Sequence, residues 1–472
     1  MLDEAVIRRT LDAALRAGAG FAELFVEDVR ATSASLDDGR VEDVVTGRDR
    51  GAGVRVVVGE TTGFAHTADL GEAGLLAAAR AAAAVAAHAP GGAARSLGLG
   101  TAGGVSRGPA AEIDPATVAK ADKVGLLRRA DEAARASHLD GLAAGDGIVQ
   151  VAARYSDSRR RTLVANTEGA FGGDEQVRSL FSVSCVAKGD AGLQTGRETV
   201  GRSAGWELFD RYDVEELART AAGRALRKLA ARPAPSGTLP VVIASGSGGI
   251  LFHEACGHGL EADLVAKGAS TFAGRVGEQV ASPLVTVIDD GTMAGEWGCY
   301  GIDDEGRPAQ RNVLIEDGVL TDYLWDFLRA RREARPSSGN GRRQSYRHLP
   351  MVRMTNTFIG AGASDPAEII ASTERGVYVA QLGGGQVNTA SGDFVFGMTE
   401  AYLIEGGEVT DPIRDGNLIG NGPAALAAID AVGDDFAMGG PGTCGKDGQG
   451  VPVGTGTPTL RVPALTVGGT AA

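Results

Sequence analysis

Arg232-Pro233-Ala234-Pro235-Ser236-Gly237 divides the 472-residue chain into two halves whose sequence patterns differ. The two prolines and the glycine end the helix predicted over residues 213–231, because proline lacks an amide hydrogen and clashes with the preceding turn. The length of the chain also favours two domains over one large core. We therefore expect an N-terminal domain of residues 1–235 and a C-terminal domain of residues 236–472.

The half before this boundary mixes helix and strand patterns. Strand-like segments rich in Val, Phe and Thr occupy residues 21–36, 41–46 and 54–58. Glycine-containing turns separate them, which indicates strands that pair with their neighbours in sequence. Apolar residues at helical spacing and helix-capping residues predict helices over residues 2–17, 71–88, 114–136 and 213–231. This half should form an α/β domain.

The half after the boundary begins with a strand, Val241-Val242-Ile243-Ala244, followed by a glycine-rich turn and a helix that starts near Ile250. Short strand patterns separated by glycine turns fill most of the remainder. Glycine supplies 71 of the 472 residues, about twice its usual share, which fits a chain with many turns. The C-terminal domain is therefore predicted to be mainly β, and the whole chain to belong to the α+β class.

Charge and hydropathy argue against two classes of partner. The 46 basic and 60 acidic residues give a net charge of -14, which would repel a nucleic-acid backbone. The most apolar stretch falls short of the roughly 20 apolar residues that a membrane-spanning helix needs. The first residues include acidic side chains and lack the apolar core of a secretory signal. We expect a cytoplasmic protein without nucleic-acid or membrane partners.

Two histidines and a glutamate lie close together in Phe252-His253-Glu254-Ala255-Cys256-Gly257-His258-Gly259, although the chain has only six histidines. Neutral imidazoles suit zinc, and a carboxylate beside them can accept a proton from a water molecule at the metal. We predict that His253 and His258 bind Zn²⁺ and that Glu254 is the general base.

The spacing of the two histidines predicts an irregular helix. Positions five residues apart differ by about 140° around an α-helix, so a regular helix would not direct both rings at one ion. A single wider turn of the π type would restore their convergence. Gly257 and Gly259 would ease that distortion.

A catalytic zinc site usually has three protein ligands and one open position, so a third ligand is needed. Spacing and chemistry offer five candidates, namely Cys256, Glu261, Asp263, Cys299 and Cys444. Glu261 follows His258 by three residues and could share its helical face, whereas Cys444 lies in a glycine-rich loop that could bring a thiolate to the ion. The residues by themselves leave these alternatives open.

Two further segments are candidates for substrate binding. Arg342 belongs to an arginine-rich stretch, and Tyr346 and His348 beside it could donate hydrogen bonds to a carbonyl oxygen in the transition state. A solvated basic surface would explain the same stretch. Gly384 and Gly385 lie among strand-like residues, where the missing side chains would let an extended peptide approach a sheet edge. A bulge or turn would explain these glycines equally well.

Several further segments join the histidine motif in one recognisable pattern. They are His253-Glu254-Ala255-Cys256-Gly257-His258-Gly259-Leu260-Glu261, Asp303-Asp304-Glu305-Gly306, Asn340-Gly341-Arg342-Arg343, His348-Leu349-Pro350, Arg353-Met354-Thr355-Asn356-Thr357, Gly383-Gly384-Gly385-Gln386-Val387 and Cys444-Gly445-Lys446. With this set, the sequence from Gly249 onward resembles the TldD/PmbA family of metallopeptidases, and within it the catalytic TldD branch. The non-catalytic branch lacks the histidine motif, which is complete here.

The resemblance implies zinc on the two motif histidines and on a C-terminal cysteine, which correspond to His253, His258 and Cys444. It also implies a zinc-dependent metallopeptidase that hydrolyses unfolded or extended peptides, including precursors of modified peptides. The catalytic subunit in this family typically works with a metal-free paralogue. We therefore expect a heterodimer or a higher oligomer, with a homodimer as the alternative.

A non-catalytic role is the alternative to peptidase activity. The chain could be a peptide-binding or scaffold subunit that retains zinc for structure alone. Structural zinc sites are usually closed by four protein ligands, so the number of side chains around the ion distinguishes the two roles.

Overall fold

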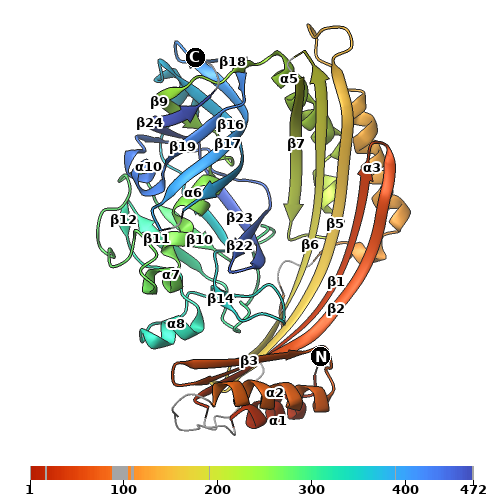
Figure 1. Cartoon of the computed structure of the whole chain (residues 1–472), viewed down its shortest axis with the longest axis vertical. Helices are drawn as coiled ribbons and strands as arrows, with labels where there is room; N and C mark the ends of the chain where they lie inside the picture. Colours follow the sequence, from red (N-terminus) through yellow and green to blue (C-terminus); the bar gives the residue numbers. More distant parts are fainter. Residues whose placement is uncertain are drawn as a thin grey trace.

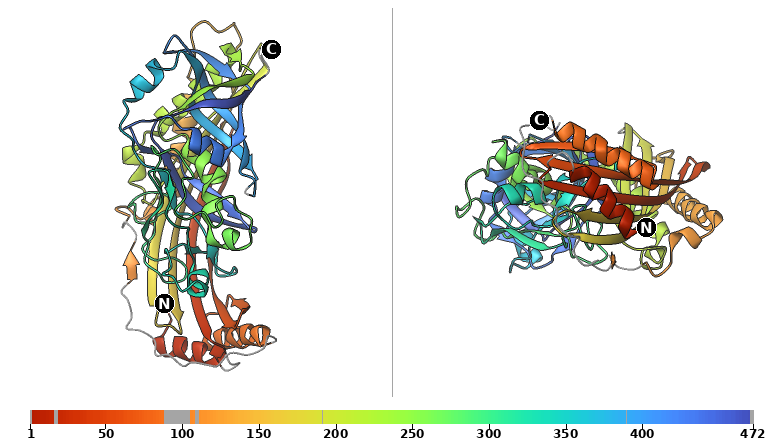
Figure 2. Two further views of the ribbon diagram at one scale, coloured as in Figure 1. Left: turned by 90° about the vertical axis from the view of Figure 1, so that its left-hand side faces the viewer. Right: turned by 90° about the horizontal axis from the view of Figure 1, so that it is seen from below.

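The computed structural model describes residues 2–15, 19–87, 105–107, 111–190, 192–388 and 390–469. Within them the chain forms an elongated molecule with two parts side by side (Figure 1, Figure 2). A long curved sheet with helices packed on it lies opposite a second part built mainly from two further sheets. The predicted α+β class is confirmed. The boundary after residue 235 stays a prediction.

The first sheet has the strand order β3-β2-β1-β5-β6-β4, with β7 also paired to β6, and only its β4–β6 pair is parallel. Its strands are β1 (Phe21–Asp37), β2 (Arg40–Val58), β3 (Thr61–Thr67), β4 (Val105–Arg107), β5 (Gly147–Asn166), β6 (Phe171–Gly189) and β7 (Gly192–Arg202). Asp38 and Gly39 both have positive φ, as the two-residue turn between β1 and β2 requires. The predicted pairing of residues 21–36 with the next strand is confirmed. The predicted glycine turn between residues 46 and 54 is wrong, because pairing with β1 holds residues 40–58 in one continuous strand, β2.

Two pairs of helices cover this sheet. The pairs are α1 (Glu4–Leu15) with α2 (Glu72–Ala86), and α3 (Lys120–Arg135) with α5 (Val214–Ala230). The first pair packs with β1 and β2 in one apolar core at the lower end in Figure 1, and the second packs with β5 and β6 in another. The helix predicted over residues 114–136 begins instead as a separate 3-10 helix, η1 (Pro115–Thr117), because Asp114 caps that turn through Ala116.

Five strands of the second part close a ring in the order β16-β9-β24-β19-β17, since β17 pairs back with β16. The strands of this sheet are β8 (Arg232–Pro233), β9 (Gly237–Ile243), β16 (Arg375–Val387), β17 (Asp393–Glu405), β18 (Glu408–Arg414), β19 (Asn417–Asn421), β20 (Ala431–Val432) and β24 (Leu460–Gly468). Closure removes the free edges that an open sheet would expose. The interior belongs to one large apolar core that also receives a helix, α6 (Gly249–Ala255).

A neighbouring sheet completes the second part in the order β12-β11-β10-β15-β23-β21, with β22 paired to β23. Its strands are β10 (Val287–Asp290), β11 (Arg311–Glu316), β12 (Val319–Leu320), β15 (Asn356–Ile359), β21 (Ala437–Met438), β22 (Gly442–Lys446) and β23 (Gln449–Thr457). The remaining short elements are α4 (Leu208–Arg211), η2 (Gly257–Leu260), α7 (Ala262–Ala266), α8 (Phe327–Arg332), β13 (Gly341–Arg342), β14 (Met351–Val352), α9 (Pro366–Ala371) and α10 (Gly422–Ala428).

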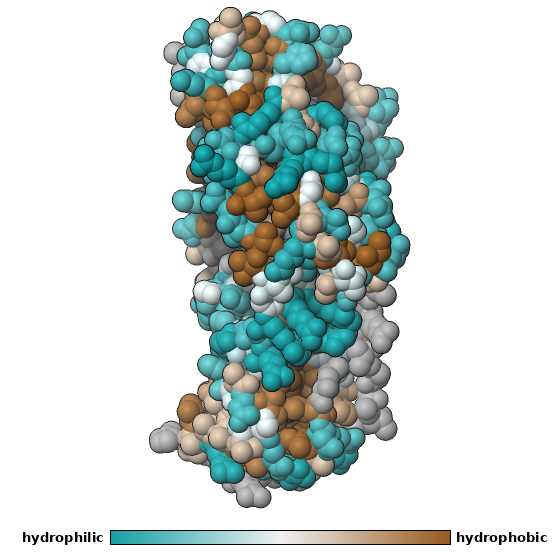
Figure 3. Space-filling model, turned by 90° about the vertical axis from the view of Figure 1, so that its right-hand side faces the viewer, coloured by the Kyte–Doolittle hydropathy of each residue, from teal (hydrophilic) through white to brown (hydrophobic). Residues whose placement is uncertain are grey.

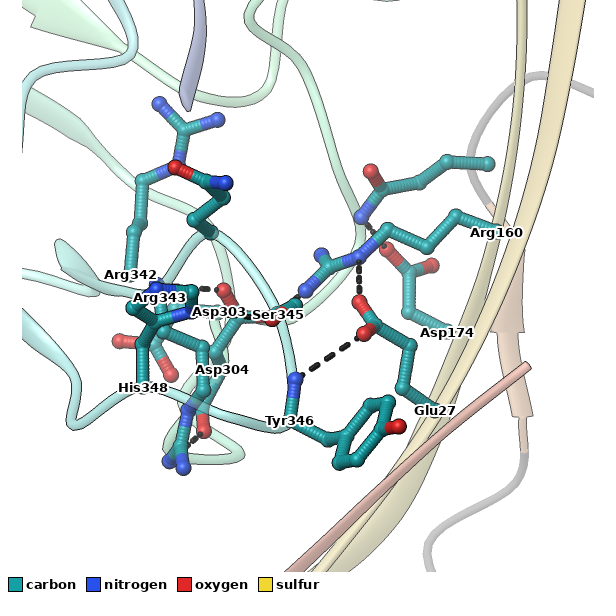
Figure 4. Close-up of polar contacts among 12 residues, drawn as sticks. Glu27, Arg160, Asp174, Asp303, Asp304, Arg342, Arg343, Ser345, Tyr346 and His348 are labelled. Carbon is teal, nitrogen blue, oxygen red and sulfur yellow. Dashed lines mark hydrogen bonds and ion pairs between the residues drawn. The ribbon is translucent and has the colours of Figure 1, made fainter. Parts of the chain in front are cut away.

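Buried ion pairs join the curved sheet to the second part. Glu23 on β1 accepts hydrogen bonds from Arg343 at 2.6 Å and from Arg55 at 2.7 Å, and all three side chains are buried. A second set, visible in Figure 4, joins Glu27 and Arg160 of the sheet to Asp304. Charges removed from water need such partners, so these pairs fix how the two parts pack.

We predict that Arg343→Met destabilises the protein by about 3–5 kcal/mol, because it leaves Glu23 buried with one of its two guanidinium partners missing. Arg347→Met is the matched control. It removes an ion pair with Asp49 in which both side chains are nearly half exposed, and such pairs contribute about 1 kcal/mol or less. Urea unfolding of the two variants and the parent protein measures the difference. Equal shifts of the unfolding midpoint in both variants would contradict a stabilising role for the buried pair.

Figure 3 shows the face that carries the outer helices and the edge of the curved sheet, seen from the right-hand side of Figure 1. Apolar side chains gather there in separate patches, with bands of polar side chains between them. The face is therefore mixed in polarity along its length. Among the described residues, none of the helices has the length and apolar character needed to cross a membrane.

Candidate active site

The metal motif lies on α6, a short helix buried between the two sheets of the second part. Gly249, its first residue, lies against β23, and a Cβ atom there would come within 2.4 Å of the amide nitrogen of Gly456. Only glycine fits this close approach. It lets α6 lie directly on the strand whose hairpin partner, β22, carries Cys444.

The helix breaks between the two histidines, as their spacing predicted. α6 ends at Ala255, Cys256 leaves the helical region with φ of -128°, and η2 carries His258. The predicted π-type turn is wrong in detail, because the chain changes to a 3-10 helix instead of widening. A Cβ atom at Gly257 would lie 2.3 Å from the Met354 sulfur, so a larger residue at the break would require the buried Met354 side chain to move.

His253, His258 and Cys444 form a compact cluster. One ligand atom from each lies within 4.8 Å of the other two, and all three residues are buried. The Cys444 sulfur is 3.3 Å from Nε2 of His258. The ring centroids of His253 and His258 are 5.3 Å apart, and the two ring planes are nearly perpendicular. Among the five candidates for a third ligand, Cys444 is the one that the structure brings to both imidazoles.

The cluster has the electrostatics of a metal site. Burial alone would raise the pKa of Cys444, but the adjacent His253 and His258 outweigh burial and lower the pKa to about 4. The sulfur is then a thiolate at neutral pH. Both ring nitrogens of His253 are buried and have no hydrogen-bond partner among the described residues. A buried imidazole without a partner is costly, and a metal ion would satisfy it.

These residues fit zinc. Two imidazoles and one thiolate are the nitrogen and sulfur donors that zinc prefers over the oxygen ligands of calcium or magnesium. Nδ1 of His258 donates a hydrogen bond to the Glu261 carboxylate, 3.0 Å away, so Nε2 is the nitrogen directed to Cys444. A carboxylate on the far nitrogen orients a ligating imidazole in this way.

Lys446 holds that carboxylate in place. Its ammonium group donates to Glu261 at 2.9 Å, to Asp263 at 2.7 Å and to the Val352 carbonyl at 3.0 Å. Burial would raise the pKa of Glu261, but His258 and Lys446 lower it to about 2. Glu261 and Asp263, which were candidates for the third ligand, therefore lie behind His258 and bind Lys446.

A pocket of about 500 Å³ opens onto the cluster between the curved sheet and the second part. Its charged or metal-binding lining residues are Glu198, Arg202, Arg224, His253, Glu254 and Cys444. Glu254 keeps 36% of its side chain exposed, and one of its carboxylate oxygens is 3.7 Å from Nε2 of His258. It is thus an accessible carboxylate beside the buried ligands.

Arg342, Tyr346 and His348 lie elsewhere, near the polar contacts that Figure 4 shows, and of the three Tyr346 bonds the curved sheet. Arg342 is buried and donates to the carbonyls of Met354 and Pro452. The Tyr346 amide donates to Glu27, and His348 bonds Ser345. None of the three is among the residues that line the pocket. A substrate-binding role for them stays a prediction.

Gly384 and Gly385 are exposed on β16, just beyond the pocket wall. The wall is formed by the preceding residues of the same strand, Ala380, Gln381 and Leu382. Peptide binding at the two glycines also stays a prediction.

The pocket contains residues that the sequence patterns missed. Arg202 and Arg224 come from the N-terminal half, and no local motif connects them with the histidines. Lys446 had a signal, because it follows Cys444 in one of the segments shared with the TldD/PmbA family, but its contact with Glu261 emerges only from the fold.

A buried pair of histidines with a cysteine and an accessible glutamate in a cleft is typical of zinc hydrolases. Comparison with known proteins then identifies the family. Models of the PmbA/TldA metallopeptidases match residues 22–86 as domain 1, residues 113–229 as the central domain and residues 236–469 as the C-terminal domain. The chain belongs to this metallopeptidase family, which confirms the resemblance seen in the sequence.

Individual relatives agree with this assignment. A Haemophilus influenzae protein named metalloprotease TldD homolog is 39% identical over 459 residues, covering 95% of this chain and 93% of that protein. A Methanothermobacter thermautotrophicus protein named metalloprotease is 36% identical, covering 95% of this chain and 96% of the other. The solved structure of TldE from Thermococcus kodakarensis shares the fold, with a TM-score of 0.75 and 20% identity over 98% of this chain and 99% of that chain.

Proposed function

We propose that this metallopeptidase uses zinc held by His253, His258 and Cys444 to hydrolyse unfolded or extended peptides, including precursors of modified peptides. The convergence of these three buried donors beside an accessible carboxylate is the observation that carries the proposal. Relatives named metalloproteases over nearly the whole chain support it.

Zinc bound by these donors would polarise the peptide carbonyl and make water more acidic. Glu254 accepts a proton from the attacking water through its carboxylate. The water oxygen forms a bond to the carbonyl carbon, the C–N bond breaks, and Glu254 returns the proton to the leaving amine. Glu261 and Lys446 keep His258 in one orientation throughout.

The number of protein ligands favours catalysis over a structural zinc. Among the described residues the cluster has three members, whereas a structural site usually has four. One position is thus left for water or substrate. A peptide-binding or scaffold subunit with structural zinc remains the alternative function, and it would require a fourth side chain.

Two strands in the lining of the pocket offer main-chain groups to an extended peptide. β7 pairs with β6 on one side, and its residues Glu198, Thr199 and Val200 line the pocket. Another part of the lining comes from β16, which extends past Val379, where its parallel pairing with β9 ends, and there the Leu382 amide donates to the Ser247 hydroxyl at 2.9 Å. Unpaired strand edges bind extended chains through main-chain hydrogen bonds, which folded substrates have already used internally.

We propose a metal-free paralogue as the partner, in a heterodimer or a higher oligomer, with a homodimer as the alternative. The structure named TldE has the same fold as this chain, which supports a partner of the same architecture that could pack against it. We further propose that the protein acts in the cytoplasm.

The substrate proposal predicts that cleavage follows the unfolded fraction of a substrate. A small domain should be cut about a hundredfold more slowly in its native form than as a mutant of the same sequence destabilised by about 3 kcal/mol, because 1.4 kcal/mol changes the unfolded population about tenfold. Initial cleavage rates of both forms, measured with the candidate paralogue present, test this. A short peptide from the same domain, added to both mixtures, controls for enzyme activity. Equal cleavage rates for the native and the destabilised domain would show that the enzyme does not select substrates by how often their chain is unfolded.

A further inference from the structure

Arg202 is one of two arginines that line the catalytic pocket, and among the described residues no carboxylate accepts a hydrogen bond from it. Arg224, the other arginine of the lining, is bound to both Glu198 and Glu400. Arg202 instead lies 3.8 Å from Glu296 through its Nε, a distance too long for a strong hydrogen bond. Its Nη1 donates to the Gly201 carbonyl at 2.9 Å.

The fold holds Arg202 near the metal cluster. The preceding residue, Gly201, packs against Pro441, and a Cβ atom at this glycine would lie 2.8 Å from the Pro441 ring. Pro441 is three residues before Cys444 in the loop that leads into β22. The guanidinium group also lies over the Tyr212 ring, 5.7 Å from its centre, which limits the directions it can adopt.

Arg202 and Tyr212 separate the catalytic pocket from a second pocket of about 300 Å³. The side chain of Arg202 is 21% exposed, so it is partly shielded from water but still reachable from the pocket. Three acids line the second pocket. Glu207 accepts hydrogen bonds from the amides of Ile113 and Gly205, Glu112 pairs with Arg211, and Glu296 faces Arg202 only at 3.8 Å, which leaves donors of the guanidinium unused. A partly buried guanidinium with unused donors attracts a carboxylate and can bind it through two parallel hydrogen bonds.

We infer that Arg202 binds a carboxylate of the peptide substrate and so determines which peptides the pocket prefers. This inference rests on the proposed peptidase function. The carboxylate has two possible sources, the C-terminus of the peptide or an Asp or Glu side chain. In the first case the enzyme favours bonds near the C-terminus of its substrates, and in the second it favours acidic peptides.

Direct binding tests the inference without requiring turnover. The full zinc-loaded chain with Glu254→Gln, together with the candidate paralogue, is titrated with three forms of one short Ala/Gly/Ser peptide. The forms are the free acid, the C-terminal amide, and the amide with one internal Asp. We expect the free acid or the Asp peptide to bind at least about tenfold more tightly than the neutral amide, as hydrogen bonds between charged groups allow. Whichever form binds more tightly identifies the source of the carboxylate.

Adding Arg202→Gln should remove this preference and leave the affinity for the neutral amide unchanged, which also shows that the pocket still folds. Arg202→Lys should restore part of the preference, because a lysine keeps the charge but not the planar pair of donors. Arg197→Gln is the control, since Arg197 is exposed on the same strand and does not line the pocket.

The outcomes separate this inference from the proposed function. Two results would overturn the role of Arg202 and leave the proposed function intact. In one, all three peptides bind with equal affinity. In the other, Arg202→Gln weakens the binding of the free acid and the amide by the same factor. If the zinc-loaded chain binds none of the peptides, peptide recognition and the role of Arg202 both fail.

Discussion

Glu254→Gln should lower kcat/KM for peptide hydrolysis by about a hundredfold to ten-thousandfold, the usual contribution of a general base. The amide of glutamine cannot accept the proton from the attacking water or return it to the leaving amine. Glutamine has nearly the same shape, and Glu254 is not a member of the metal cluster, so zinc should stay bound. Hydrolysis of an unfolded peptide and the zinc content of the same samples, measured together, separate the two effects.

Glu316→Gln makes the same substitution on an exposed residue of β11, outside the pocket lining, and should leave both quantities unchanged. Retained hydrolysis in Glu254→Gln would show that Glu254 is not the general base. Loss of zinc together with activity would place Glu254 among the metal-binding residues instead.

The sequence predicted the centre of the site because its chemistry is local. His253, Glu254 and His258 lie within one short segment, and their spacing already predicted an irregular helix. Where α6 ends, the Met354 sulfur packs against Gly257 from a distant part of the chain. The local pattern does not contain such tertiary contacts, and it predicted a π turn where the chain forms a 3-10 helix.

The third member of the metal cluster could not be chosen from spacing. Cys444 reaches His258 only because β22 pairs with β23 and β23 supports α6. The same limit applies to the arginine-rich stretch. Arg343 faces Glu23, 320 positions away, so its burial in an ion pair depends on how the two parts pack.

The helices predicted over residues 71–88 and 213–231 match the structure more closely than the first sheet does, because their apolar spacing is a local signal. The glycines between residues 46 and 54 predicted a turn, but pairing with β1 keeps that segment in one strand. No sequence pattern indicated Arg202 as a pocket residue. It lies near Cys444 because the end of β7 packs against the loop at Pro441.

Cys444→Ser should weaken zinc binding at least about a hundredfold, because it replaces a thiolate with a neutral hydroxyl, and even changes to the partners of zinc ligands weaken binding by about 10–100-fold. The two imidazoles lower the pKa of Cys444 against the opposing effect of burial, and so make its thiolate the charged donor of the cluster. Cys256→Ser is the matched control, since Cys256 is equally buried, lies between the two histidines and is not a member of the cluster. Circular dichroism of both variants verifies that they fold.

The zinc content of the protein, purified without added metal, tests the central claim most directly when the parent chain, Cys444→Ser and Cys256→Ser are measured side by side. The proposed site predicts about one zinc per chain in the parent and in Cys256→Ser, and far less in Cys444→Ser. Unchanged zinc in Cys444→Ser would show that Cys444 is not the third ligand. An active parent protein that contains no zinc would contradict the zinc-peptidase account as a whole.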